Sequence, residues 1–230
     1  MKKNSPSCFK FGVSYFCPVC KSVHLIKSGF TDNKKQRYKC KKCGKRFITE
    51  YTYNAYQLSI NQQISTLTKE SVGIRGTARI LKISTTTLLK RIILIAEKIP
   101  EPTISSNGIY EVDELRSFVL KKNNQIWLAY ALERTNRQVV SFAVGARTNQ
   151  TLNGVLCKLC TAKKIYTDKL RQYKSLIPKR MHRTPLYGTN HIERKNLTIR
   201  THIKRLSRRT ICFSKSIFVL GSVVKIYFWG

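Results

Sequence analysis

The chain is poor in acidic residues. Its 230 residues include 11 Asp and Glu against 44 Lys and Arg, which gives a formal net charge of +33. Hydrophobic residues make up 42% of the sequence and aromatic residues 10%, which excludes a disordered basic tail. A folded protein with this charge favours a polyanionic partner, and nucleic acid is the foremost candidate.

Long apolar segments are also missing. No run approaches the roughly 20 residues of a membrane helix, and the longest, residues 217–229, is interrupted by Gly221 and Lys225. The N-terminus contains lysines but no apolar stretch of signal-peptide length. We therefore expect a cytoplasmic protein without a membrane partner, in which cysteines are thiols or metal ligands rather than disulfides.

Four cysteines near the N-terminus form two Cys-x-x-Cys pairs. Cys17 and Cys20 are followed, after 19 residues, by Cys40 and Cys43. Each pair predicts a tight turn that places two thiolates on one edge of a tetrahedron, and two such turns complete a structural zinc site. A segment this short depends on the metal for its folding energy. The alternative is four buried structural or redox cysteines without a metal.

Residues 72–92 have the outline of a helix-turn-helix motif. Apolar spacing predicts a first helix that ends at Leu81, a two-residue turn and a second helix capped by Ser84. A preceding helix over 61–69 completes a three-helix unit. The alternative is an ordinary helical hairpin with a solvated basic face. The expected DNA contacts are Arg79, Thr85, Thr86, Thr87, Lys90 and Arg91.

Composition divides the chain into successive parts. A zinc-ribbon domain is expected over 1–55 and an all-α helix-turn-helix DNA-binding domain over 56–99. A breaker-rich linker follows over 100–108, and the remainder, 109–230, mixes strands and helices. The predicted fold class is multidomain, with a small zinc ribbon, a helix-turn-helix and a C-terminal α/β domain.

The last part has the element order of a ribonuclease H-like fold. Strands are expected over 109–119, 125–132 and 138–144, then a helix over 149–162, a short strand over 164–167 and a later helix over 190–207. In this fold the first strand lies beside the fourth. The ends of these strands therefore meet at the centre of the sheet.

Three of the few carboxylates in this part are placed to meet. Asp113 lies in the first strand, Asp168 follows the fourth, and Glu193 lies in the first turn of the later helix. Three clustered carboxylates need divalent cations, and two such cations stabilise the attacking and leaving oxygens of phosphoryl transfer. Mg²⁺, or Mn²⁺ in its place, suits these ligands. Taken singly, Asp168 is equally a strand-end turn residue and Glu193 a helix-start acid.

Other residues are expected around this site. Arg200 lies two turns beyond Glu193 on one helix face, where it is expected to hold a DNA phosphate. Glu114 is expected on the opposite sheet face from Asp113, in a structural role, whereas Glu111 shares the face of Asp113 and is expected to support the site. Further DNA contacts are expected from Arg194, Lys195 and Lys204.

The remaining cysteines and the sheet aromatics are expected in the core. Cys157 and Cys160 have knuckle spacing but lie in a predicted helix without a partner pair, and Cys212 is also expected to be buried. Trp127 and Tyr130 fit strand packing rather than a stacking platform for bases.

The chain resembles the transposases of the "IS one" family of bacterial insertion sequences, which belong to the DDE superfamily. The resemblance covers almost the whole chain, and its most specific block runs from Ile192 to Leu197 and on to Arg200. One departure is Leu115-Arg116, where the family often has an aromatic residue. The other matching stretches are the four-cysteine ribbon and residues 76–80, 112–119, 166–168, 205–206 and 213–216.

This resemblance implies a function. It implies the product of two fused reading frames, a DDE transposase that cleaves and joins DNA strands in a Mg²⁺-dependent reaction. The implied catalytic residues are Asp113, Asp168, Glu193 and Arg200. The implied partners are the double-stranded terminal inverted repeats and the target DNA, bound by a homo-oligomer in the nucleoid of a bacterial or archaeal cell, with no small-molecule substrate.

Two other functions remain open at this point. A non-catalytic repressor that occupies the repeats would have no use for Asp168 and Glu193 in so basic a segment. A structure-specific nuclease of the same fold would have little use for N-terminal modules that recognise a sequence.

Overall fold

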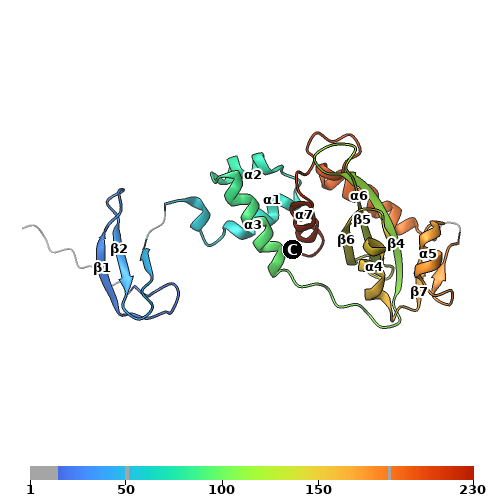
Figure 1. Ribbon diagram of the computed structural model, residues 1–230, viewed down its shortest axis with the longest axis horizontal. Coiled ribbons are helices and arrows are strands. Elements are labelled where there is room, and N and C mark those ends of the chain that lie inside the picture. The colour runs from blue at the N-terminus through green and yellow to red at the C-terminus, as the bar shows by residue number, and fades with distance from the viewer. Residues whose placement is uncertain (1–14, 50–51, 186–187) are drawn as a thin grey trace, which may run out of the picture. The chain divides into compact units, whose positions relative to one another are not determined.

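A computed structural model of the chain describes residues 15–49, 52–185 and 188–230 (Figure 1). The chain forms two compact units, one extending to Tyr56 and the other running from Gln57 to Gly230. The helix-turn-helix segment and the α/β segment therefore belong to the same unit. The finer boundaries at 56–99, 100–108 and 109–230 stay predictions, and residues 1–14 of the expected first domain lie outside the described residues.

The first unit is a small antiparallel sheet. Its strands lie in the order β1-β2-β3 and are followed by a short 3-10 turn, η1 (Asn54–Tyr56). Tyr38 pairs with Phe47 across β2 and β3, and their ring centroids lie 6.1 Å apart. Such a core buries little apolar surface, so further cross-linking is needed for stability. The strands are β1 (Leu25–Phe30), β2 (Gln36–Cys40) and β3 (Arg46–Ile48).

The second unit begins with three helices, and the sequence predicted their order. Helix α1 covers Ile60–Lys69, α2 covers Ile74–Leu81 and α3 covers Thr85–Lys98. The Ser84 hydroxyl accepts a hydrogen bond from the Thr87 backbone N–H at 3.1 Å, which confirms the predicted cap. Lys82 and Ile83 form the turn before this cap. Lys82 adopts a left-handed conformation with φ of +51°, and this conformation ends α2.

The rest of the second unit is built on a five-stranded sheet in the order β6-β5-β4-β7-β8. The central strand β4 pairs antiparallel with β5 and parallel with β7, which confirms that the first and fourth predicted strands are neighbours. The strands are β4 (Ile109–Phe118), β5 (Gln125–Glu133), β6 (Val139–Gly145), β7 (Lys164–Tyr166) and β8 (His182–Arg183).

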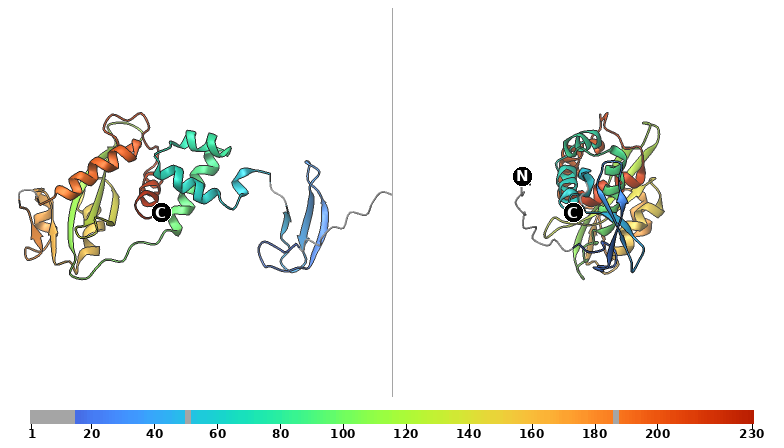
Figure 2. Two further views of the ribbon diagram at one scale, coloured as in Figure 1. Left: turned by 180° about the vertical axis from the view of Figure 1, so that it is seen from behind. Right: turned by 90° about the vertical axis from the view of Figure 1, so that its left-hand side faces the viewer.

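Helices lie on both faces of this sheet (Figure 2). Helices α4 (Asn149–Leu156) and α5 (Arg171–Leu176) cover one face, where β4 contributes Tyr110 and Val112 to the core. Helix α6 (Asn190–His202) covers β4 from the other face, followed by the 3-10 turn η3 (Lys204–Leu206). Since strand side chains alternate, successive residues of β4 face different helices.

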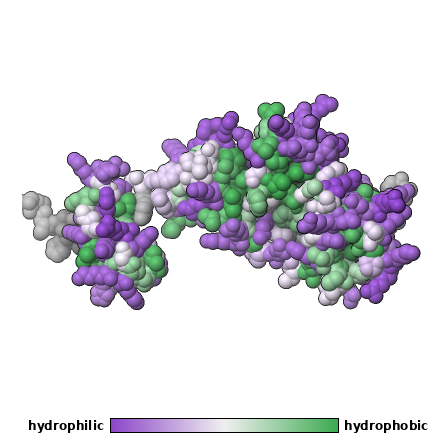
Figure 3. Space-filling view, in the orientation of Figure 1, coloured by the Kyte–Doolittle hydropathy of each residue, from purple (hydrophilic) through white to green (hydrophobic). Residues whose placement is uncertain are grey.

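The C-terminal helix α7 (Ile217–Trp229) lies between α1 and α3 on one side and β6 on the other (Figure 1). Hydrophobic residues gather around it (Figure 3), and Val224 and Ile226 are fully buried. The Trp229 indole N–H donates to the Val139 carbonyl at 2.7 Å, and the Phe228 ring lies 5.8 Å from that of Tyr130. A helix that is apolar on all sides needs partners on all sides. Helix α7 therefore joins the helix-turn-helix segment to the sheet.

No helix among the described residues has both the length and the hydropathy of a membrane span.

The prediction of buried cysteines is wrong. Cys157, Cys160 and Cys212 are all exposed. Helix α4 ends at Leu156 rather than at residue 162, and the tighter 3-10 turn η2 (Cys157–Leu159) rotates the cysteines outward. Leu159 takes the buried position instead. Of the sheet aromatics, Tyr130 is buried as predicted and Trp127 is half-buried.

Replacing Ile226 by alanine tests the joining role of α7. Ile226→Ala is expected to lower the free energy of unfolding of the second unit by about 2–5 kcal/mol. It removes buried methyl groups and leaves a cavity that the surrounding side chains fill only partly. Amide hydrogen exchange should accelerate in both α3 and β6, since each packs on α7. The control is Phe218→Ala on the same helix, which is 82% exposed and should leave stability nearly unchanged. Faster exchange in β6 alone would contradict the joining role.

Candidate active site and metal centres

Two carboxylates meet because β4 and β7 run parallel. Glu111 on β4 is aligned with Tyr166 at the end of β7, so Asp168, two residues further, comes level with Asp113. One carboxylate oxygen from each of Asp113, Glu114 and Asp168 lies within 4.8 Å of the other two. The structure thus brings Asp113 and Asp168 together, and it adds Glu114, for which the sequence predicted only a structural role.

The Asp113 carboxylate is held by hydrogen bonds from both sides. Its Oδ1 accepts from the Glu114 backbone N–H at 2.7 Å, and its Oδ2 accepts from the Asn196 side-chain amide at 2.6 Å. The Asn196 Oδ1 in turn accepts from the Tyr130 hydroxyl at 2.9 Å, which fixes the orientation of the amide. Burial nevertheless raises the pKa of Asp113 to about 6. The ionised form of Asp113 is therefore unfavourable unless a cation binds to it.

Glu111 anchors the start of α6 over the same sheet face. Its fully buried carboxylate accepts from the Ile192 backbone N–H and from His191 Nδ1, both at 2.8 Å. The Arg134 Nε lies 3.1 Å from it and balances its charge. A carboxylate at a helix N-terminus also interacts favourably with the helix dipole. Glu111 thus supports the site by fixing the helix that carries Asn196.

Glu193 lies outside the close group of carboxylates. It is exposed in the first turn of α6, and its Oε1 accepts a hydrogen bond from the Thr189 hydroxyl at 2.8 Å. Residues three apart on a helix share a face, so Glu193 is on the same face as Asn196, which contacts Asp113. The structure therefore places Glu193 one helical turn away from Asn196, the residue that contacts the Asp113 carboxylate.

Glu114 reaches the group from the opposite sheet face. Its side chain is 2% exposed, and its Oε2 lies 3.5 Å from the Arg147 guanidinium. Its Oε1 has no hydrogen-bond partner among the described residues, and neither has the buried Tyr173 hydroxyl of α5. Burial raises the pKa of both groups. The alternation of side chains along a strand correctly predicted the sheet face from which Glu114 leaves β4. It does not predict that the Glu114 carboxylate reaches Asp113 and Asp168 beyond the end of β7.

Arg200 ties α6 to the end of β4. Its guanidinium donates to the Leu206 carbonyl at 2.9 Å and to the Arg116 carbonyl at 3.4 Å. Partial burial lowers the pKa of this guanidinium. A phosphate contact by Arg200 stays a prediction. Of the other basic residues expected to contact DNA from this region, Arg194 and Lys204 are exposed and Lys195 is half-buried.

The helix-turn-helix presents part of its predicted DNA-contacting surface to solvent. The exposed residues are Arg79, Thr85, Thr86 and Lys90. Thr87 instead bonds to Ser84, and the Arg91 guanidinium donates to the Asn61 side chain at 3.2 Å. Thr87 therefore contributes to the cap of α3, and Arg91 joins α3 to α1.

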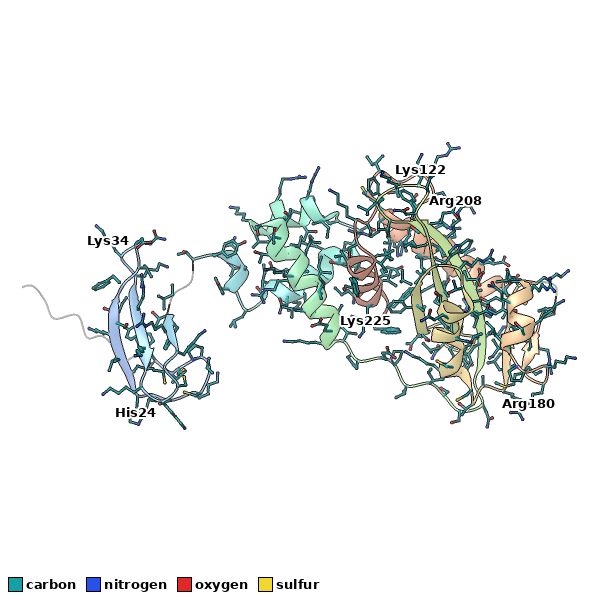
Figure 4. All side chains as sticks on the ribbon, viewed as in Figure 1. His24, Lys34, Lys122, Arg180, Arg208 and Lys225 are labelled. Carbon is teal, nitrogen blue, oxygen red and sulfur yellow. The ribbon has the colours of Figure 1, made fainter. Side chains whose placement is uncertain are left out.

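Basic side chains also project from one end of the sheet, where two loops run together. The Leu120 backbone N–H donates to the Ser214 carbonyl at 2.9 Å, which joins the turn after β4 to the segment before α7. Lys122 and Arg208 extend from these two loops at the same end of the unit (Figure 4). Besides the start of α3, this end of the sheet therefore also presents positive charge to solvent.

The four predicted zinc ligands lie together in the first unit. The Sγ atoms of Cys17 and Cys43 are 3.4 Å apart, and those of Cys20 and Cys40 are 3.5 Å apart. A tetrahedral site with Zn–S bonds of about 2.3 Å places sulfur atoms about 3.8 Å apart, close to these separations. The backbone N–H of Cys20 lowers the pKa of Cys17 to about 6, which favours the thiolate. The sulfur arrangement fits a zinc ion.

The same backbone turn forms each half of this site. The Lys21 N–H donates to the Cys17 carbonyl and the Gly44 N–H to the Cys40 carbonyl, each at 3.0 Å. Lys21 and Gly44 both adopt left-handed conformations, with φ of +58° and +72°. Glycine adopts this conformation without strain, which explains its place after the second pair.

Comparison with known proteins identifies the two parts of the second unit. The family model described as "IS1 transposase" matches residues 108–229, and the one described as "InsA C-terminal domain" matches residues 51–92. Among solved structures, a chain of the cryoEM structure of a simian T-cell lymphotropic virus intasome in complex with PP2A regulatory subunit B56 gamma matches with a TM-score of 0.38 and 15% identity. That match covers 70% of this chain and 66% of the other. It is too weak to support a conclusion.

Curated relatives cover about half of this chain and most of their own length. The InsB protein of insertion element iso-IS1n from Shigella dysenteriae is 40% identical over 118 residues, which are 50% of this chain and 90% of the relative. The InsB protein of IS1 from Shigella flexneri is 36% identical over 119 residues, or 51% and 91%. An InsB protein of IS1 from Escherichia coli K12 is 34% identical over 119 residues, or 51% and 71%. The chain belongs to the IS1 transposase family, whose members cleave DNA and transfer strands.

Proposed function

We propose that this transposase binds the terminal inverted repeats of an insertion sequence, cleaves the DNA strands there and joins them to target DNA with the help of divalent cations. The observation that carries the proposal is the meeting of Asp113 and Asp168 at the centre of the sheet. In a chain of net charge +33, clustered and partly buried carboxylates are unfavourable for binding DNA unless they hold cations. The strand order supports a ribonuclease H-like fold for this domain.

The proposed catalytic ligands are Asp113, Asp168 and Glu193. Their carboxylate oxygens suit Mg²⁺ or Mn²⁺, which prefer oxygen donors. Bound cations would stabilise the attacking and leaving oxygens of phosphoryl transfer. Glu193 would join the others by leaving its hydrogen bond to Thr189, a change of side-chain rotamer within one helical turn. Asn196 would keep Asp113 oriented throughout.

DNA would be held at two surfaces of the second unit. The exposed start of α3, with Thr85, Thr86 and Lys90, is proposed to read the repeat sequence in the major groove. Arg194, Lys195, Lys204 and Arg200 are proposed to position phosphates near the carboxylates. Two inverted repeats require two copies of each surface, which favours a homo-oligomer on the DNA ends.

The first unit is proposed to be a zinc ribbon that contributes to end binding. Its apolar core is small, and a metal held by four thiolates would supply the missing folding energy. The four sulfur atoms lie close enough to share one ion. The exposed lysines beside them are available for phosphate contacts.

The two alternative functions are less well supported. A repressor needs no carboxylate cluster, and the match to the transposase family over residues 108–229 covers the whole α/β part. A structure-specific nuclease has no need of a sequence-reading module, whereas residues 51–92 match a family model of their own.

Removal of zinc tests the first unit. Cys40→Ser, or a chelator, is expected to unfold residues 15–49 and to weaken binding to repeat ends, because the thiolates lose the ion that organises them. The second unit should keep its fold. Metal analysis of the purified chain should return one zinc per molecule, and a content well below one would refute the ribbon.

Substitutions at the start of α3 test sequence recognition. Thr86→Ala and Lys90→Ala are expected to reduce the preference for repeat DNA over random DNA by about 1–3 kcal/mol for each lost base contact. Salt titration in a gel-shift assay separates this effect from general affinity, which depends on phosphate contacts. The matched control is Lys98→Ala at the far end of the same helix. Unchanged discrimination in both variants would refute the helix-turn-helix assignment.

Conservative substitutions of the carboxylates test the catalytic site. Asp113→Asn, Asp168→Asn and Glu193→Gln are each expected to abolish strand cleavage and joining in Mg²⁺ while leaving binding to the repeat ends intact. These side chains would hold cations rather than touch bases, and loss of a negative charge eases the approach of phosphate. The measurement is cleavage of end-containing DNA beside a gel shift. Normal cleavage by the Asp168 variant would exclude the proposed site, and normal cleavage by the Glu193 variant would remove that residue from it.

A further inference from the structure

The carboxylate cluster contains an oxygen that nothing in the described structure satisfies. Glu114 Oε1 is buried and has no hydrogen-bond partner, although its sister oxygen Oε2 faces Arg147. A buried, unpaired carboxylate oxygen is expensive, because burial removes its hydration without replacing it. Each such atom in a folded protein requires an explanation, such as an ion or an ordered water.

The position of this residue favours an ion. The carboxylate oxygens of Glu114, Asp113 and Asp168 lie within 4.8 Å of one another, so a single cation can contact all three residues. A water molecule can donate to only two of these acceptors. The oxygens gathered here are acceptors when ionised, and a divalent cation satisfies several acceptors at once.

A second buried polar group borders the same place. The Tyr173 hydroxyl comes from α5, the helix that covers the Glu114 side of the sheet. Among the described residues it makes no direct hydrogen bond, but it lies close enough to the Glu114 carboxylate to interact with it. Glu193, in contrast, already has a partner in Thr189.

We infer that Glu114 is a direct ligand of the divalent cation held by Asp113 and Asp168, through the oxygen Oε1 that does not face Arg147. This inference rests on the proposed function, since it assigns a further ligand to the same site. The site then draws on both faces of the sheet, with Asp113 on the α6 side and Glu114 on the α5 side. Glu193 completes the site from the exposed first turn of α6.

Metal binding can be measured without DNA cleavage. Titration of the full chain with Mn²⁺, followed by calorimetry and by electron paramagnetic resonance of the free ion, gives the dissociation constant. Glu114→Gln keeps the shape of the side chain and removes its charge. It is expected to weaken Mn²⁺ binding by at least about tenfold, the lower end of what losing even an indirect partner of a metal site costs.

Two matched variants separate a ligand from a merely structural role. Glu133→Gln changes a buried glutamate that bonds to Asn136, outside the cluster, and should bind Mn²⁺ like the unsubstituted chain. Arg147→Gln removes the ion pair but leaves Glu114 Oε1 in place, and it should retain Mn²⁺ binding. If Arg147→Gln reproduces the loss seen in Glu114→Gln, Glu114 acts only through its ion pair and the inference is overturned.

Coordinated water gives a second readout. Luminescence decay of Tb³⁺ bound at the site, compared in H₂O and D₂O, counts the water molecules on the ion. A lost carboxylate ligand is replaced by water, so Glu114→Gln is expected to raise that count by about one, whereas Arg147→Gln should leave it unchanged. An unchanged count together with unchanged Mn²⁺ affinity would overturn the inference and indicate that an ordered water satisfies Glu114.

Asp113→Asn distinguishes failure of this inference from failure of the proposed function. If Asp113→Asn abolishes Mn²⁺ binding and Glu114→Gln does not weaken it, the metal site stands and only the assignment of Glu114 is wrong. If Asp113→Asn binds Mn²⁺ normally, the proposed catalytic site is itself wrong, and the inference is overturned with it.

Discussion

The parallel pairing of β4 with β7 is the constraint on which the site depends. A parallel neighbour brings two distant stretches of chain into register, and here it sets Asp168 beside Asp113. Because β7 is short and ends before the level of Asp113, the edge of β4 is left open at that point. Carboxylates from three positions then converge where backbone pairing stops.

Helix α6 is held over this point by buried charge rather than by apolar packing alone. Glu111 accepts hydrogen bonds from the first turn of the helix and is balanced by Arg134. Arg200 bonds to backbone carbonyls near the other end of the helix. Truncating one partner of such a buried network leaves the other uncompensated, which is strongly destabilising. The helix that carries Asn196 and Glu193 is thus fixed in position along its length, and the Asn196 amide can orient Asp113.

The C-terminal helix gives the second unit a property that separate domains would lack. Helix α7 is buried against α1, α3 and β6. Binding of DNA to the helix-turn-helix therefore acts on a body that also includes the sheet. The distance between sequence reading and strand cleavage is then set by packing rather than by the segment over 100–108. This arrangement suits an enzyme that must cut at a defined position relative to the sequence it binds.

Much of this protein follows from the sequence alone. The spacing of Cys17, Cys20, Cys40 and Cys43 predicts the turns that gather four sulfur atoms, because the geometry is local. Apolar periodicity and Ser84 predict the helix-turn-helix for the same reason. The scarcity of acids in a chain of net charge +33 singles out Asp113 and Asp168, and the strand order brings them together.

Other features were decided only by tertiary structure. Alternation along β4 gives the face from which Glu114 leaves the strand, but its carboxylate ends beside Asp113 because the neighbouring strand stops, and that depends on pairing between distant segments. The exposure of Cys157 and Cys160 depends on a helix that tightens into a 3-10 turn, which periodicity does not report. The position of α7 likewise could not be predicted from the sequence. An apolar helix specifies that it needs partners on all sides, whereas which surfaces provide them is settled only when the helix-turn-helix and the sheet pack together.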